Sequence, residues 1–189
     1  MRKHVFFKLA ILVTMIAACS GTEKKQDIDN AQIVSNTNSP DSTVINFLKW
    51  YRDNEERLSK IQLIKGGWPD TTTFYSVDFN QTEKYLLELS KSNFLSEKFI
   101  SDLRDYFKTS NEYLIQHHEN DGPPSGFDAD LIMKSQDYDD VWTNIDKAKE
   151  LSKDISSNKA NLKFQFAGNY KMEFSLSKTG NKWLIDLLD

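Results

Sequence analysis

The 189-residue chain has one cysteine, three histidines and no second long apolar run. One cysteine cannot form an internal disulfide, nor a zinc site made of several thiolates. Beyond the first 18 residues, no stretch reaches the roughly 20 apolar residues that a membrane-spanning helix needs. The sequence also lacks a glycine-rich phosphate loop, a G-x-S-x-G nucleophile elbow and the HExxH spacing of zinc proteases. We therefore assign no catalytic residue, metal site or cofactor, and favour a non-enzymatic protein.

The single cysteine, Cys19, directly follows an apolar N-terminal segment, MRKHVFFKLAILVTMIAAC. This segment has a basic start, a core from Leu9 to Ala18 that is apolar apart from Thr14, and small residues before the cysteine. These are the three parts of a secretory signal. The core is too short to span a bilayer, so the pattern predicts export of the remaining chain.

The ending Ile16-Ala17-Ala18-Cys19 resembles the lipobox of bacterial lipoproteins. That resemblance implies a signal peptide over residues 1–18, cleavage before Cys19, and lipidation of its sulfur and new amino group. Several acyl chains on one residue hold a protein to a membrane far longer than a single chain. In Gram-negative lipoproteins, an Asp directly after the lipidated cysteine usually goes with retention in the inner membrane. This chain has Ser20 at that position, so the resemblance implies the outer membrane. The alternative is an ordinary signal peptide with a chance cysteine at the cut.

Charge and composition describe the rest of the chain. The full chain has a formal net charge of −4. Signal cleavage would make the remaining chain more negative, because it removes the basic residues Arg2, Lys3 and Lys8. Such an acidic chain is a poor nucleic-acid binder, because phosphate contacts need clustered Lys and Arg. Residues 19–40 are polar without a sustained period, which predicts a flexible tether after the lipidated cysteine. Alternatively, Ile33 and Val34 begin a first strand. Residues 41–189 are long enough for a single domain.

Apolar spacing predicts helices over 40–60, 80–89 and 97–118, with a short extended segment at 72–79. Ser39 and Pro40 suit the start of the first helix. Asn80 with Glu83 resembles a capping pair at the start of the second helix. Ser96 can cap the third helix. The 119–140 segment carries two prolines, two glycines and several acidic residues, and is predicted to be a long connection.

Residues 162–187 alternate apolar and polar side chains in three runs separated by glycine-containing turns. This period-two pattern predicts an antiparallel meander. A weaker pattern over 142–151 predicts a fourth strand, although a helix there stays open. The order of elements predicts an α+β fold, with N-terminal helices packed on a curved C-terminal sheet of about four strands.

Segments including "VINFLKWY", "GFDADLIMKSQD" and "NKWLIDLL" resemble an uncharacterised domain of bacterial lipoproteins. That domain is similar to the NTF2-like or cystatin-like fold, in which a curved sheet cradles a long helix. The resemblance covers roughly residues 40–189. It implies this fold and carries no activity, because the fold hosts enzymes, ligand pockets and interaction modules alike.

The acidic segment "GFDADLIMKSQDYDD" could offer oxygen ligands to calcium, but it lacks the EF-hand order of ligands. A solvated loop is the favoured interpretation. In it, Asp128, Gln136 and Asp137 bond nearby backbone N–H groups. His117 and His118 are adjacent, so they do not share a helix face and do not suggest a metal site.

Aromatic residues supply the remaining candidates. Trp68 and Tyr138 lie beside turn and acidic residues, where exposed aromatics often mark interfaces. If a small ligand binds between the first helix and the sheet, Trp50, Tyr51, Trp142 and Trp183 are the candidate lining residues. If the protein is instead a hydrolase or isomerase, an aspartate such as Asp130 must meet a histidine in one cleft. The favoured hypothesis is a lipid-anchored envelope protein that binds another protein.

Overall fold

The computed structural model describes residues 38–189. The signal peptide, Cys19 and the tether lie outside the described residues, so these remain predictions. None of the described helices has the length and apolar character needed to cross a bilayer.

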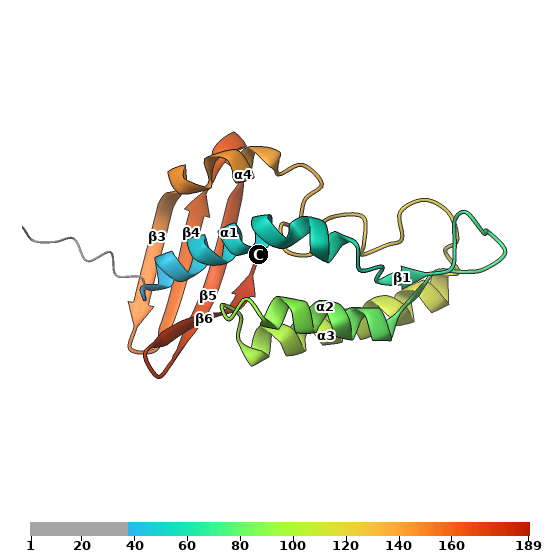
Figure 1. Cartoon of the computed structure of the whole chain (residues 1–189), viewed down its shortest axis with the longest axis horizontal. Coiled ribbons are helices and arrows are strands. Elements are labelled where there is room, and N and C mark those ends of the chain that lie inside the picture. The colour runs from blue at the N-terminus through green and yellow to red at the C-terminus, as the bar shows by residue number, and fades with distance from the viewer. Residues whose placement is uncertain (1–37) are drawn as a thin grey trace, which may run out of the picture. The chain divides into compact units, whose positions relative to one another are not determined.

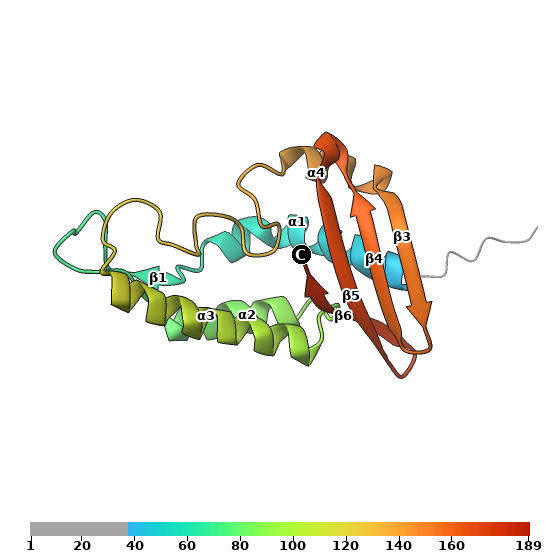
Figure 2. The ribbon, with the colours of Figure 1, turned by 180° about the vertical axis from the view of Figure 1, so that it is seen from behind.

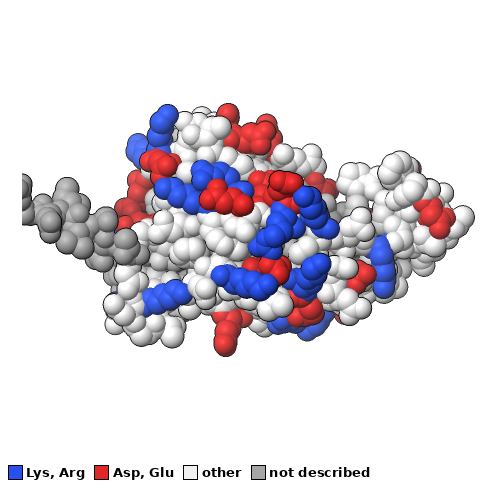
Figure 3. All heavy atoms as spheres, in the orientation of Figure 1, with Lys and Arg blue, Asp and Glu red and all other residues white. Residues whose placement is uncertain are grey.

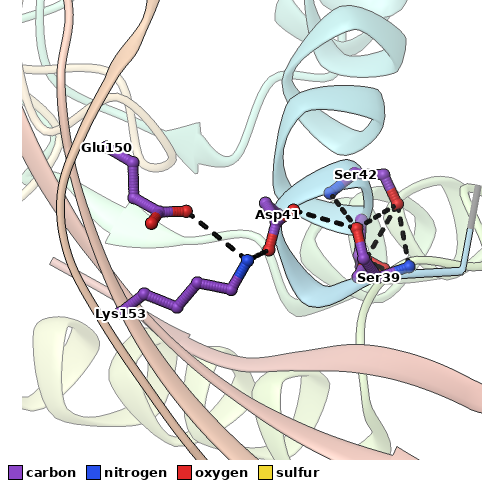
Figure 4. Close-up of polar contacts among 6 residues, drawn as sticks. Ser39, Asp41, Ser42, Glu150 and Lys153 are labelled. Atoms are coloured by element: carbon purple, nitrogen blue, oxygen red, sulfur yellow. Dashed lines mark hydrogen bonds and ion pairs between the residues drawn. The ribbon is translucent and has the colours of Figure 1, made fainter. Parts of the chain in front are cut away.

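Helix α1, Pro40–Ser59, begins where the sequence predicts. The Ser39 hydroxyl accepts a hydrogen bond from the Ser42 N–H, and the Ser42 hydroxyl accepts one from the Ser39 N–H. This reciprocal pair satisfies donors that a helix N-terminus otherwise leaves free. The first turn also pairs Asp41 with Lys153 of strand β3 (Lys149–Ser156), and Lys153 contacts Glu150 as well (Figure 4). The start of α1 is therefore fixed to the edge of the sheet.

The C-terminal sheet is a four-stranded antiparallel meander in the order β3-β4-β5-β6. Its strands are β3 (Lys149–Ser156), β4 (Lys159–Gln165), β5 (Lys171–Thr179) and β6 (Lys182–Leu188). Leu162 lies opposite Phe174, and Phe164 opposite Met172, so the alternating apolar residues share the buried face. A short turn, η2 (Ala167–Asn169), joins β4 to β5. The predicted α+β fold is confirmed.

The predicted strand over 142–151 is wrong in its first half. Residues Asp139–Asn144 form a short helix, α4, and Ile145–Lys147 form a 3₁₀ turn, η1. Trp142 is therefore helical, and the strand begins at Lys149. Every residue of β3 is exposed, and a bulge lies between Glu150 and Ser152. An exposed, bulged edge strand has no buried face to impose alternation, which explains the weak sequence pattern.

Two more helices form a hairpin beside α1, α2 (Phe79–Ser90) and α3 (Glu97–His117). The N-cap of α2 is Asp78, not Asn80, since the Asp78 carboxylate accepts from the Asn80 and Gln81 N–H groups. The extended segment predicted at 72–79 is reduced to β2 (Ser76–Val77). It pairs with β1 (Ile64–Lys65), and residues before it form a turn.

The core is one cluster that includes buried residues of α1, of one face of the sheet and of the α2–α3 hairpin. No described helix covers the opposite face of the sheet (Figures 1 and 2). Val44, Phe47 and Leu48 of α1 are fully buried, and they meet apolar residues of β4 to β6. The space between the first helix and the sheet is thus filled with side chains. The alternative hypothesis of a ligand pocket at that place gains no support from this packing.

Candidate binding cleft

A cavity of about 810 Å³ lies beyond the sheet, beside the C-terminal half of α1. Its walls come from four segments: residues 51–59 of α1, the 61–69 connection, residues 78–85 at the start of α2, and the 124–138 part of the long loop. In Figure 1 these segments occupy the half of the molecule that is farther from β3. Four of the sequence-predicted residues line it: Tyr51, Trp68, Asp130 and Tyr138.

Asp130 fixes the long loop to α1. One carboxylate oxygen accepts the backbone N–H groups of Ile132 and Met133, at 2.8 and 2.6 Å. The other accepts the hydroxyl of Tyr51 at 2.7 Å. These bonds hold Ile132 and Met133 in the core, where both are fully buried. The carboxylate therefore both shapes the loop and stands at the cavity wall.

A second carboxylate, that of Glu55, lies one helical turn after Tyr51 on α1. It accepts the hydroxyl of Tyr138 at 2.7 Å and the indole N–H of Trp142 at 2.8 Å. The Tyr138 and Trp142 rings meet edge to face, with centroids 5.4 Å apart, and Trp142 also packs on Tyr51. Positions i and i+4 share one helix face, so Tyr51 and Glu55 together engage the loop and α4.

The tyrosines of this cluster stay neutral. Burial raises the pKa of Tyr51, and the nearby Tyr85 and Asp130 raise it further. Burial, followed by the charge of Asp130, likewise raises the pKa of Tyr85. The pKa of Tyr138 is raised by burial and by its bond to Glu55. All three hydroxyls are consequently neutral rather than phenolate nucleophiles, and those of Tyr51 and Tyr138 donate to carboxylates.

Neither carboxylate of the cluster forms an ion pair with a described residue, although the charge of Lys134 acts on Asp130. In the part of the chain that the structure describes, no ion pair within 4 Å involves Glu55 or Asp130. Elsewhere many charges are paired, as Arg57 and Lys91 are with Glu88. Basic and acidic side chains lie side by side across the middle of the face in Figure 3. The cleft therefore carries negative charge that no ion pair among the described residues neutralises.

Trp68 stands at the cleft wall with 68% of its surface exposed. The turn that carries it begins with Gly66 and Gly67, at φ of 76° and 68°. A Cβ on Gly66 would lie 2.2 Å from the Phe74 carbonyl oxygen, and one on Gly67 would lie 2.0 Å from the Tyr75 ring. Only glycine fits both positions, so this close turn depends on the glycine pair.

The Trp68 turn, residues 66–75, is also fixed to the long loop. The Gly67 N–H donates to the Thr73 carbonyl at 3.1 Å, and the Asn120 amide donates to the Thr71 carbonyl at 2.7 Å. The Tyr75 N–H donates to the Glu119 carbonyl at 2.7 Å. An exposed tryptophan is thus carried by a hydrogen-bonded turn rather than by a loose loop.

The remaining aromatic candidates lie elsewhere. Trp183 of β6 is 5% exposed, belongs to the core, and has the Lys178 ammonium 5.7 Å from its ring centroid. Trp50 packs on Phe47, with ring centroids 6.3 Å apart. Neither lines the cavity. Trp142 supports the cleft through Glu55 without lining it.

The acidic loop is fixed by a different residue from the one predicted. Asp130 supplies the carboxylate that binds backbone N–H groups, whereas Asp128 is exposed and contributes its backbone carbonyl, which accepts the Gln136 amide. The Asp137 N–H donates to the Ser135 hydroxyl. Among the described residues, no group of three or more His, Cys, Asp or Glu side chains is arranged to hold a metal ion.

Both histidines have structural contacts outside the cleft. His117 stacks on Tyr113, with centroids 3.8 Å apart, and its Nδ1 lies 2.8 Å from the Tyr113 carbonyl oxygen. His118 packs edge to face on Phe74. The cavity lining includes neither histidine, so the Asp–His pairing that a hydrolase would require is not formed by Asp130.

Two residues central to the cleft, Glu55 and Tyr85, were missed from the sequence. Glu55 follows Tyr51 by four residues, a spacing that places both on one helix face, so its location could have been inferred. Tyr85 falls within an apolar helix stripe, where core packing is the default interpretation. Its approach to Tyr51 depends on how α2 packs against α1, which no local pattern reports.

Comparisons with family models, with curated proteins and with solved structures gave no significant match to this chain.

Proposed function

We propose that this protein is a lipid-anchored, non-enzymatic envelope protein whose domain binds another protein at the cleft. The observation that carries the proposal is the exposure of Trp68 on a hydrogen-bonded turn at the cleft wall. Large rigid aromatics dominate the binding energy of many interfaces, because they bury much area at a small cost in conformational entropy. The turn is already ordered by its own hydrogen bonds, which lowers that cost further.

The location of the Trp68 turn suits this role. Asn38, the first described residue, donates its side-chain amide to the Asn181 carbonyl in the turn between β5 and β6, beside the sheet. The Trp68 turn lies at the opposite end of the described residues (Figure 1). A chain lipidated at Cys19 would enter the domain at the sheet end. The cleft would then face away from the point of attachment, accessible to a partner.

Site-specific crosslinking in cells tests this proposal. A photo-crosslinking amino acid at position 68 of the full-length protein should give a discrete crosslinked species in membranes, identifiable by mass spectrometry. The matched control is position 87, since Leu87 is 58% exposed on α2 and lies outside the cleft. Equal crosslinking at both positions, or none at position 68, would contradict the proposal.

The lipid anchor needs a separate test. Labelling cells with an alkyne analogue of palmitate should tag the wild-type protein, and the Cys19→Ala variant should remain untagged. Tagging of that variant, or an intact N-terminus on the purified wild-type protein, would refute lipidation at this residue.

A small-ligand function is the second candidate, favoured by the cavity volume. About 810 Å³ lies within the range of roughly 300–1,000 Å³ typical of small-molecule sites. Native mass spectrometry of protein purified from its own cells would show an added mass if a small molecule fills the cleft. That mass should vanish in a variant with a bulky residue in the wall, such as Ala129→Trp. An unmodified mass in the wild type would count against this candidate.

A further inference from the structure

We infer that the partner segment in the cleft presents a basic side chain, Lys or Arg, to Asp130 and Glu55. This inference rests on the proposed function and names the chemistry of the partner. It starts from the cavity, whose walls supply three features that a basic side chain requires: unbalanced negative charge, aromatic rings and apolar surface for the methylene groups.

The negative charge is fixed in place. Asp130 is held by Tyr51 and two backbone N–H groups, and Glu55 by Tyr138 and Trp142. All of these donors are neutral, so the hydrogen bonds orient each carboxylate without neutralising it, and Lys134 acts on Asp130 without forming an ion pair. Each oxygen of a carboxylate has two lone pairs and can therefore accept a further hydrogen bond. A guanidinium or ammonium group would supply both the missing charge and that bond.

The aromatic walls favour the same occupant. Trp68, Phe127 and Tyr138 line the cavity along with the two buried tyrosines. A cation near the face of such a ring is attracted by the ring's quadrupole. Leu58 and Ile61 line the wall next to α1, where the stem of a Lys or Arg side chain could pack.

An anionic occupant fits poorly. Lys65 is the one basic residue in the described lining, whereas Asp78 joins Glu55 and Asp130 as a third carboxylate. Asp78 is engaged as the cap of α2, where it offsets the positive end of that helix. The lining therefore has three carboxylates against Lys65, and Lys134, which is outside the lining, offsets part of the charge of Asp130. A carboxylate or phosphate would be repelled.

The test uses the purified domain-bearing chain without its signal segment, residues 20–189, and pools of random hexapeptides with one fixed central residue. The fixed residue is Arg, Lys, citrulline or Glu, and binding is followed by fluorescence anisotropy of the labelled pools. Citrulline matches arginine in shape but is uncharged. The Arg and Lys pools should bind at least about tenfold more tightly than the citrulline and Glu pools.

Two neutral variants examine the carboxylates. In Asp130→Asn and Glu55→Gln, the side-chain oxygen can keep the N–H bonds and the amide can donate to the tyrosine oxygen, so the local bonding survives without the charge. Each should weaken the Arg pool about tenfold and leave the citrulline pool unchanged. The matched controls are Asp128→Asn in the same loop and Glu56→Gln in the same helix, since both acids are exposed. Circular dichroism confirms that each variant is folded.

The outcomes separate this inference from the proposed function. The inferred basic side chain of the partner is refuted if the citrulline and arginine pools bind equally, or if the variants bind like wild type. Crosslinking at position 68 would leave protein binding in place even then. Failure of every pool to bind also overturns the inference. If free arginine amide binds as tightly as the Arg pool, the source is a small cation, and the partner segment is refuted.

Discussion

The two ends of the described chain differ in how their polar groups are satisfied. At the sheet end, charges pair with opposite charges: Lys153 contacts Asp41 and Glu150, and Lys159 contacts Asp186. At the cleft end, Glu55 and Asp130 are held by neutral donors alone, and Trp68 faces solvent. The first arrangement uses its charges to fix strands and helices. The second leaves charge and aromatic surface that the proposed binding of a partner would use.

This difference has a physical basis. A protein that must bind keeps part of its surface less satisfied than its core, because groups already paired internally gain little from a partner. The sheet end should therefore be sensitive to substitution in stability, and the cleft end in binding. Four measurements test this distinction, and they follow in order of decreasing expected effect.

The largest expected effect is at Phe47, which is fully buried between α1 and the sheet. Phe47→Ala should lower the free energy of unfolding by about 3–5 kcal/mol, since it removes apolar burial and leaves a cavity. Urea titration followed by circular dichroism measures this. Trp68→Ala is the comparison, and should change the free energy by less than about 0.5 kcal/mol because its ring is exposed. Similar losses of unfolding free energy in both variants would contradict the distinction between the sheet end and the cleft end.

Asp186 makes stability at the sheet end depend on pH. Burial opposes its ionisation, but bonds from Ser96, Lys159 and Ser177 outweigh burial and leave its pKa lowered. A lowered folded-state pKa contributes stability above about pH 4, which is lost as the pH falls through that pKa.

Asp186→Ala should therefore cost about 2–3 kcal/mol at pH 7 and less at pH 3, because protonation of this carboxylate in the unfolded chain below about pH 4 removes part of its contribution. Urea midpoints at several pH values measure the difference. A difference that stays constant from pH 7 to 3 would show that the carboxylate's charge is not involved.

Asp130 tests the structural part of the cleft. Asp130→Ala leaves the Tyr51 hydroxyl and two backbone N–H groups without their acceptor, and should lower stability by about 1–3 kcal/mol. Asp128→Ala, in the same loop, should be nearly neutral because that side chain is exposed. Thermal unfolding of both variants settles which aspartate fixes the loop; a larger effect at Asp128 would reverse the assignment.

The smallest expected effect is at Lys153, whose pair with Asp41 joins β3 to α1 (Figure 4). Both side chains are about one-third exposed, so Lys153→Ala should cost no more than about 1 kcal/mol, with less effect in high salt. Lys98→Ala, which removes an exposed pair within α3, should cost less still. Salt-independent losses at Lys153 would point to packing rather than charge.

The sequence predicted the parts of the fold that repeat locally. Ser39 and Ser96 mark helix starts correctly, and alternation over Leu162 to Leu176 predicts the pairing of β4 and β5. It failed where local pattern is weak. Trp142 lies in a helix rather than a strand, because the exposed edge strand after it shows no alternation. Asp128 was preferred over Asp130, since nothing in the sequence tells which carboxylate meets Tyr51, 79 residues away.

By itself, the sequence determined the α+β class, three main helices and the meander, because periodicity and caps are properties of neighbouring residues; the N-terminal lipoprotein signal stays a prediction. The tertiary structure alone decided where the cleft lies and which side chains meet in it. Glu55 acquires its partners Tyr138 and Trp142 from more than 80 positions along the chain. Contacts between distant segments depend on how whole elements pack, and that packing is fixed by the summed burial of the core rather than by any local pattern.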